Sequence, residues 1–199
     1  MNQIATFPDE LRPEVLVEDY CQGIFPMAED DGQICWYSPD PRAILPLERF
    51  HVPRSLATIV GRSLFEIRVN TAFKQVITAC SARKPTWISP QIRAAYVQLH
   101  QLGLAHSVES WQNGQLLGGL YGVALGGAFM GESMFHRVRD ASKVALVALV
   151  DRLKERGFEL LDVQFLTEHL QRFGAVQIPR REYLQRLSSA LEQSPRFEG

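Results

Sequence analysis

The chain has 199 residues, with 21 Lys and Arg against 22 Asp and Glu, which gives a formal net charge of −1 and a pI of about 6.5. A composition of 46% hydrophobic and 22% charged residues excludes a disordered or strongly basic chain, so nucleic-acid binding would depend on a local patch. The N-terminus carries no signal-peptide pattern and the longest apolar run is Val144 to Val150, so we expect a cytoplasmic protein without a membrane span.

The first part of the chain is short and punctuated by prolines, and we expect a small N-terminal domain at 1–40 ahead of a larger domain at 41–199. An amphipathic helix is predicted to start at Pro8–Pro13 and run to Tyr20. An acidic loop follows, and then an extended segment at 36–42, where two prolines favour turn or extended geometry.

The larger domain alternates helices and strands. The Asn113-Gly114 pair predicts a two-residue hairpin turn between two of its strands. In chain order the pattern predicts a strand at 42–45, a helix at 55–60, a strand at 65–70, helices at 72–82 and 90–102, strands at 106–111, 115–125 and 128–135, a helix at 141–156, a strand at 158–165, a short helix at 168–173, a strand at 175–179 and a helix at 181–191.

The order of these elements from residue 91 indicates an α+β fold. A helix that connects two parallel strands forms a right-handed crossover. The order matches the N-acetyltransferase (GNAT) core, so we expect a GNAT-like mixed sheet with helices on both faces, plus the small N-terminal domain.

The strand 158–165 carries two polar residues in an apolar run. Asp162 and Gln164 are two apart and should point to one face. Burial of an unpaired carboxylate or amide is costly, so the pair needs partners or a function. Pairing with backbone donors at a strand end is the alternative.

Glu132 stands in a second apolar strand that is rich in glycine. It is either an edge carboxylate that faces water or an acidic group that binds an ammonium in a pocket. Phe129 and Met134 would then line the pocket, although both residue types are common in cores. The glycines between Gly118 and Gly131 either serve tight turns or allow close approach of a ligand or another backbone.

The segment 136–143 precedes a helix where a coenzyme A-dependent enzyme of this fold needs a glycine-rich loop, and it contains no glycine. Coenzyme A is therefore not the expected acyl donor. The two arginines and the lysine of this loop either meet phosphates or are solvated. Trp87 is either a stacking surface or a core cover. The scattered histidines and three cysteines fit no metal site.

Several long motifs resemble the bacterial leucyl/phenylalanyl-tRNA–protein transferases, from about residue 16 to 187. They are GIFPM, WYSPDPRAIL, TWI, LGLAHSVESW, LLGGLYGVALGGAFMGESMF, ASKVAL, LLDVQFLTEHL and GAVQIPRREYL. The resemblance implies transfer of leucine or phenylalanine, and more weakly methionine, from aminoacyl-tRNA to proteins with N-terminal arginine or lysine, which marks them for N-end-rule degradation. It implies no metal or coenzyme.

Carried onto this chain, the resemblance implies that Asp162 and Gln164 are the catalytic pair. The aspartate either polarises the glutamine, which then accepts a proton from the attacking amine, or the pair positions the reactants while the tRNA ribose carries the proton. A neutral glutamine is a weak base, which favours positioning. Glu132 would face an amino group and Trp87 the terminal adenosine. An apolar pocket would be shaped by Leu120, Phe129, Met134, Leu149, Leu153 and Leu161.

The sequence departs from the family pattern at a few positions. Met27 stands where a second tryptophan is usual, so we expect one-sided stacking unless Trp36 substitutes. Thr167 replaces an asparagine, and 51–68 holds only three arginines, so the acceptor-stem contact is weaker or placed elsewhere. The alternatives are a coenzyme A-dependent N-acetyltransferase, which the glycine-free loop disfavours, and a non-catalytic RNA-binding module of the same fold.

Overall fold

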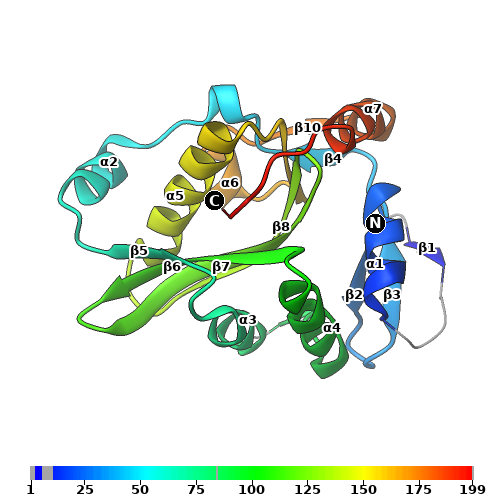
Figure 1. Cartoon of the computed structure of the whole chain (residues 1–199), viewed down its shortest axis with the longest axis horizontal. Helices are drawn as coiled ribbons and strands as arrows, with labels where there is room; N and C mark the ends of the chain where they lie inside the picture. The colour runs from blue at the N-terminus through cyan, green and yellow to red at the C-terminus, as the bar shows by residue number, and fades with distance from the viewer. Residues whose placement is uncertain (1–2, 6–10, 84, 199) are drawn as a thin grey trace.

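The computed structural model of the chain describes residues 3–5, 11–83 and 85–198, and Figure 1 draws its two sheets. The smaller sheet has three strands in the order β1-β3-β2, and the larger has seven in the order β10-β4-β9-β8-β7-β6-β5. No helix in the described part of the chain combines the length and apolar character that a membrane crossing requires.

The small sheet and α1 form an N-terminal unit beside the large sheet (Figure 1). Helix α1 begins at Pro13, where a proline loses no hydrogen bond because the first N–H groups of a helix have no partner within it. The sequence predicts that this helix starts at 8–13, of which 8–10 lie outside the described residues. The β2–β3 hairpin is not predicted, and the division of the chain at residue 40 stays a prediction. The elements of this unit are β1 (Gln3–Ala5), α1 (Pro13–Cys21), β2 (Phe25–Ala28) and β3 (Ile34–Tyr37).

The large sheet is antiparallel except for the parallel pair β8 and β9. Its strands are β4 (Arg42–Ile44), β5 (Glu66–Val69), β6 (Ala105–Gln112), β7 (Gln115–Leu125), β8 (Ala128–His136), β9 (Leu160–Gln164) and β10 (Val176–Ile178). The helices are η1 (Leu47–Arg49), α2 (Arg54–Gly61), α3 (Phe73–Ser81), α4 (Pro90–Gln101), α5 (Ala141–Arg156), α6 (Glu168–Gln171) and α7 (Arg180–Leu191).

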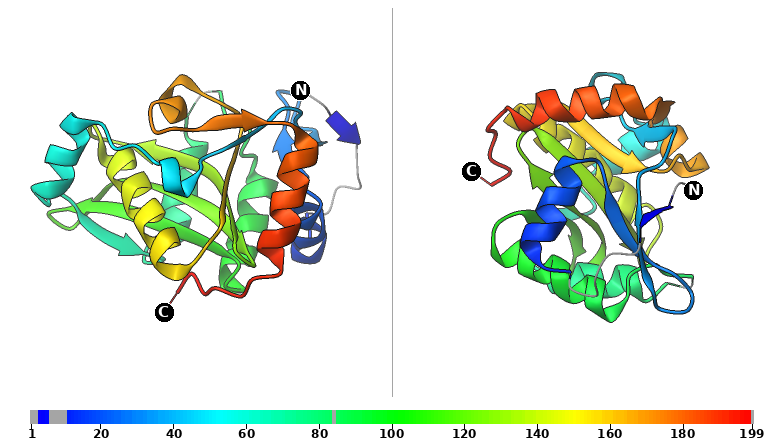
Figure 2. Two further views of the ribbon diagram at one scale, coloured as in Figure 1. Left: turned by 90° about the horizontal axis from the view of Figure 1, so that it is seen from above. Right: turned by 90° about the vertical axis from the view of Figure 1, so that its right-hand side faces the viewer.

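Helices cover both faces of the large sheet (Figure 1). Helix α5 packs on β6, β7 and β8 from one side, while α3 and α4 pack from the other. Helix α7 reaches across to α1 and so joins the end of the chain to the N-terminal unit (Figure 2). The predicted α+β class, with a mixed sheet, helices on both faces and a small N-terminal unit, is confirmed.

The parallel strands β8 and β9 separate partway along their length. Their pairing runs from Ala128 with Leu160 to Met130 with Asp162 and ends there. Strand β8 continues to His136, and β9 ends at Gln164. Backbone groups beyond the last pair are therefore directed into the gap between the two strands, and the site described below lies there.

The glycines of β7 are explained largely by contacts within the protein. A Cβ on Gly118 would lie 2.6 Å from the Cβ of Ala141, at the start of α5. A Cβ on Gly122 would lie 2.3 Å from the carbonyl oxygen of Met130, beside an irregularity in the β7–β8 register. Both glycines let two parts of the chain approach closely, which favours the close-approach reading over a direct ligand role.

Candidate active site

A cavity of about 610 Å³ lies where β8 and β9 separate, with α5 along one wall. The N-terminal unit and the segment between α3 and α4 also contribute lining residues. Its lining residues are Phe25, Met27, Arg83, Trp87, Leu120, Tyr121, Gly131, Glu132, Ser133, Met134, His136, Arg139, Asp140, Ser142, Lys143, Leu146, Leu149, Leu161, Val163, Gln164, Phe165, Thr167, His169 and Leu170.

The apolar part of the cavity lies between the sheet and α5. Four of the six predicted pocket residues line it: Leu120, Met134, Leu149 and Leu161. The other two, Phe129 and Leu153, do not, and the prediction is corrected for them. Phe129 is fully buried and stacks on Phe197, while Leu153 is fully buried in the core beneath α5.

Asp162 lies beneath the cavity wall rather than on it, and it is fully buried. Arg42 at the start of β4 forms a bidentate ion pair with it, with Nε 2.9 Å from Oδ1 and Nη2 2.6 Å from Oδ2. Tyr183 of α7 donates its hydroxyl to Oδ2 over 3.0 Å. Burial alone would lower the pKa of Arg42, but the attraction of Asp162 more than offsets this and keeps the guanidinium charged.

Gln164 lies on the cavity wall at the end of β9. Its backbone N–H donates to Oδ1 of Asp162 over 2.9 Å, and its φ is 56°, in the left-handed region that non-glycine residues rarely adopt. A hydrogen bond of 2.6 Å from Phe165 N to Val163 O closes a three-residue turn around it. When the side-chain amide is oriented so that its nitrogen faces backbone acceptors, this nitrogen donates to the carbonyl oxygen of Gly131 over 2.8 Å.

Asp162 and Gln164 therefore do come together, but not as alternation along a regular strand predicts. The left-handed turn redirects Gln164, and the contact joins the aspartate side chain to the glutamine backbone. The side-chain amide instead meets Gly131, the first residue of β8 beyond its pairing with β9.

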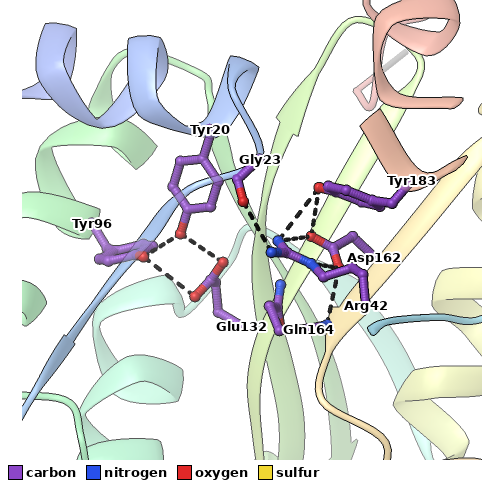
Figure 3. Close-up of polar contacts among 8 residues, drawn as sticks. All are labelled: Tyr20, Gly23, Arg42, Tyr96, Glu132, Asp162, Gln164 and Tyr183. Atoms are coloured by element: carbon purple, nitrogen blue, oxygen red, sulfur yellow. Dashed lines mark hydrogen bonds and ion pairs between the residues drawn. The ribbon is translucent and has the colours of Figure 1, made fainter. Parts of the chain in front are cut away.

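Glu132 lies on the cavity wall between two tyrosines. Tyr20 of α1 donates to its Oε1 over 2.7 Å, and Tyr96 of α4 donates to its Oε2 over 3.3 Å. The two hydroxyls also contact each other. Burial raises the pKa of Glu132 to about 8, against the opposing effect of the Tyr20 hydrogen bond. Figure 3 shows this group on one side of Gln164 and the Arg42–Asp162–Tyr183 group on the other.

Trp87 lines the cavity beside Met27, because the N–H of Ala28 donates to the Trp87 carbonyl over 3.0 Å. Trp36 does not take the place of a second aromatic here. Its side chain is 2% exposed and belongs to the core around the small sheet. One aromatic face and one thioether are thus available at this position.

Basic side chains surround another part of the cavity. Arg83 donates to the Ser133 hydroxyl over 2.9 Å, and Lys143 donates to Asp140 over 2.6 Å at the start of α5. Arg139 is 93% exposed and makes a loose ion pair of 3.4 Å with Asp140. Thr167 also lines the cavity, but its hydroxyl caps α6 by accepting from Leu170 N.

Four of these site residues are missed by sequence reasoning: Arg42, Tyr20, Tyr96 and Tyr183. Arg42 is the one with a usable signal, since it is a charged residue that opens an apolar strand. The tyrosines come from three helices far apart in the chain, and no local pattern links them. Among the described residues, no cluster of His, Cys, Asp and Glu could hold a metal ion.

Two comparisons of sequence agree with one another. Residues 44–188 match the family described as leucyl/phenylalanyl-tRNA protein transferase, and residues 9–40 match its N-terminal domain. The chain is 60% identical over 188 residues to the leucyl/phenylalanyl-tRNA–protein transferase of Herpetosiphon aurantiacus, covering 94% of this chain and 98% of the relative. It is 57% identical to that of Gloeobacter violaceus over 182 residues, covering 91% and 94%.

Solved structures with a similar arrangement are more distant. L-PGS from Bacillus licheniformis is 11% identical with a TM-score of 0.48, and the match covers 91% of this chain and 71% of that one. A ribosomal-protein-alanine N-acetyltransferase from Brucella melitensis is 16% identical with a TM-score of 0.41, covering 54% and 86%.

Proposed function

Because this chain belongs to the leucyl/phenylalanyl-tRNA–protein transferase family, we propose that it transfers leucine or phenylalanine, and methionine more weakly, from aminoacyl-tRNA to a protein N-terminus. The acceptor begins with arginine or lysine, and the product enters N-end-rule degradation in the cytoplasm, where charged tRNA is available. One observation carries the proposal: Glu132 and Gln164 share a cavity with an apolar floor and a tryptophan on its wall.

The reaction needs alignment more than activation. The ester carbon of aminoacyl-tRNA is attacked by the neutral α-amine of the acceptor, the new C–N bond forms, and the bond to the ribose oxygen breaks. One proton leaves the nitrogen and one is taken up by the ribose oxygen, so the step is balanced without a metal or coenzyme. Holding two reactants in attack geometry can supply a large part of the rate enhancement.

Glu132 is the group proposed to receive the ammonium. An α-ammonium group ordinarily has a pKa of about 7.7–8.0, and the pKa of Glu132 is raised to about 8. Proton transfer between groups of nearly equal pKa costs little free energy. Glu132 and the acceptor amine can therefore share one proton: the carboxylate–ammonium ion pair and the pair of neutral groups interconvert, and the second contains the neutral amine that attacks.

Gln164 is proposed to orient the reacting groups by hydrogen bonding. A neutral amide is too weak a base to remove the proton itself. Its side-chain nitrogen already lies 2.8 Å from the Gly131 oxygen, which fixes the plane of the amide. A fixed amide beside the ester loses little freedom when the substrate binds, and this is the contribution expected of a positioning group.

The apolar floor is proposed to hold the side chain of the transferred residue. Leu120, Leu149 and Leu161 are nearly fully buried, and Met134 adapts to the shape of its neighbour. A side chain unbranched at Cβ fits such a slot, while a charged one would lose its hydration without compensation. Trp87 is proposed to stack on the terminal adenosine of the tRNA.

The proposal is tested with a transfer assay that varies both substrates. Radiolabelled leucyl-, phenylalanyl-, methionyl- and valyl-tRNA are each combined with peptides that begin with arginine, lysine or alanine. We expect label in the arginine and lysine peptides from leucine and phenylalanine, less from methionine, and none from valine. An acetylated arginine peptide and acetyl-coenzyme A serve as controls, and transfer with either would contradict the proposal.

A further inference from the structure

We propose that Arg42 and Tyr183 are positioning residues that act through Asp162 on the backbone of Gln164. This inference rests on the proposed aminoacyl transfer, but it concerns residues to which that reaction assigns no role. Neither side chain lines the cavity, and both are almost completely buried. They can therefore affect the reaction only through the residues that lie between them and the substrate.

Every hydrogen-bonding direction of the Asp162 carboxylate is used within the protein. Oδ1 accepts from Arg42 Nε and from the Gln164 backbone N–H, each over 2.9 Å. Oδ2 accepts from Arg42 Nη2 over 2.6 Å and from the Tyr183 hydroxyl over 3.0 Å. Four donors saturate a carboxylate. Asp162 therefore has no remaining lone pair with which to polarise the Gln164 side-chain amide.

The Gln164 backbone needs such support. A φ of 56° is unfavourable for a residue with a side chain, and a conformation of this kind persists only where its surroundings enforce it. The hydrogen bond from its N–H to Asp162 and the tight turn from Phe165 N to Val163 O are the contacts that do so. The Asp162 carboxylate thus sets the position from which the Gln164 side chain enters the cavity.

Arg42 fixes Asp162 in turn, and it is itself held on all sides. Its guanidinium lies between the rings of Phe25 and Tyr183, 4.7 Å and 4.4 Å from their centroids. Its remaining nitrogen, Nη1, donates to the Gly23 carbonyl over 2.9 Å. A lysine cannot reproduce this planar fork. The chain of contacts therefore runs from the α1–β2 turn through Arg42 and Asp162 to Gln164, as Figure 3 shows.

The test compares Tyr183→Phe and Arg42→Lys with wild type under single-turnover and steady-state conditions. Tyr183→Phe removes one hydroxyl and keeps the ring on Arg42. We expect both variants to lower kcat at least about tenfold, while KM for peptide and for aminoacyl-tRNA changes less than about twofold, because neither variant replaces a residue that lines the cavity. Unchanged kcat in both variants would overturn the proposal.

A double-mutant cycle with Gln164→Ala separates positioning from general destabilisation. If Tyr183 acts through Gln164, Tyr183→Phe should lower kcat less than about twofold once Gln164 is alanine. Equal losses in both backgrounds would contradict action through Gln164. Tyr37→Phe and Arg68→Lys are matched controls: Tyr37 bonds to Glu29 and Arg68 forms an exposed bidentate pair with Glu66, and neither side chain lines the cavity or contacts Asp162 through a hydrogen bond.

Amide hydrogen exchange gives a readout that does not depend on activity. The Gln164 N–H is protected by its bond to Asp162, so exchange in the segment 160–167 should be faster in Tyr183→Phe than in Tyr37→Phe. Unchanged exchange there would overturn the inference, even if Arg42→Lys failed to fold. If the wild type failed to transfer an amino acid, the proposed function would be wrong. The exchange comparison would still test whether Tyr183 supports the backbone of Gln164.

Discussion

The Tyr20 hydroxyl of α1 donates a hydrogen bond to Glu132 of β8 over 2.7 Å, although the two residues are 112 positions apart in the chain. Tyr96 of α4 completes the arrangement, so the Glu132 carboxylate is held by two helices. The N-terminal unit is therefore part of the site and not an appendage to it. The electrostatic state of Glu132 depends on this contact.

Replacement of Tyr20 by phenylalanine should raise the pKa of Glu132 further. Burial is the main cause of its high value of about 8, and the Tyr20 hydrogen bond opposes burial because it favours the charged carboxylate. The measurement is an NMR titration of the Glu132 side-chain carboxyl carbon in wild type and Tyr20→Phe. Tyr37→Phe is the control, and a lower pKa in Tyr20→Phe would contradict the assignment.

The same pKa predicts how the stability of the protein depends on pH. In the unfolded chain Glu132 releases its proton near pH 4.5, but in the folded protein it does so only near pH 8. Between these values the folded state binds more protons, so the free energy of unfolding falls as pH rises. Glu132→Gln removes this contribution, and the difference in stability between wild type and variant should decline from pH 5 to pH 8.

Urea unfolding at several pH values measures that difference. His106, whose pKa burial lowers to about 4, contributes the opposite slope between about pH 4 and its ordinary value of 6.5, but it is present in both proteins and cancels. A constant difference between wild type and Glu132→Gln across this window would show that the carboxyl group is ionised throughout.

Removal of the Asp162 carboxylate should both destabilise and inactivate the protein. Asp162→Ala leaves the Arg42 guanidinium charged in a fully buried position, and loss of one partner of a buried ion pair costs about 3–5 kcal/mol. We expect this loss in urea unfolding, with turnover at least about tenfold lower under conditions where the variant is folded. Glu66→Ala, which breaks the exposed pair with Arg68, should leave the free energy of unfolding close to that of wild type, because solvent screens the two charges.

The regular parts of this fold are predictable from local sequence, and the polar centre is not. The Asn113-Gly114 turn and the apolar stripe of α5 identify β6, β7 and α5 because periodicity and turn chemistry act over a few residues. The β2–β3 hairpin contains Pro26, and its Asp31-Gly32 turn pair lies in an acidic segment that predicts a loop. The left-handed turn at Gln164 breaks the alternation rule because Asp162 and its partners enforce it.

The residues at the cavity likewise divide into those with a local sequence signal and those without one. Glu132 and Gln164 are visible in the sequence as polar residues in apolar strands. Arg42 is visible only as a charged residue that opens an apolar strand, and its pairing is not, since its partner is 120 positions away and the contact depends on how β4 is placed beside β9. Leu149 of α5 lines the cavity while Leu153, one helical turn further, does not, and the spacing of apolar residues along the helix does not distinguish the two.

Trp87 should contribute to binding of the tRNA and not of the acceptor. Loss of one stacked base costs roughly 1–3 kcal/mol, so Trp87→Ala should raise KM for aminoacyl-tRNA about 5-fold to 150-fold. KM for the peptide should change little, and Trp87→Phe should restore most of the loss because it keeps an aromatic face. Steady-state kinetics with each substrate varied in turn measure both constants, and an equal rise in the two would refute a stacking role.

The apolar floor should set the balance between leucine and phenylalanine, and α5 offers a matched pair of positions for the test. Leu149 lines the cavity and Leu153 lies one turn along the same helix in the core, and both are almost fully buried. Leu149→Ala enlarges the slot, so we expect the ratio of kcat/KM for phenylalanyl-tRNA over leucyl-tRNA to rise about tenfold, within the range that a few methylene contacts supply.

Leu153→Ala should lower the free energy of unfolding by about 2–5 kcal/mol and leave that ratio unchanged, because the space it opens lies in the core. Competition between the two charged tRNAs in a single reaction measures the ratio directly and is insensitive to the fraction of folded enzyme. A shift in preference from Leu153→Ala as large as that from Leu149→Ala would mean that the slot extends deeper beneath α5, to the position of Phe129, and that the boundary drawn for the cavity is wrong.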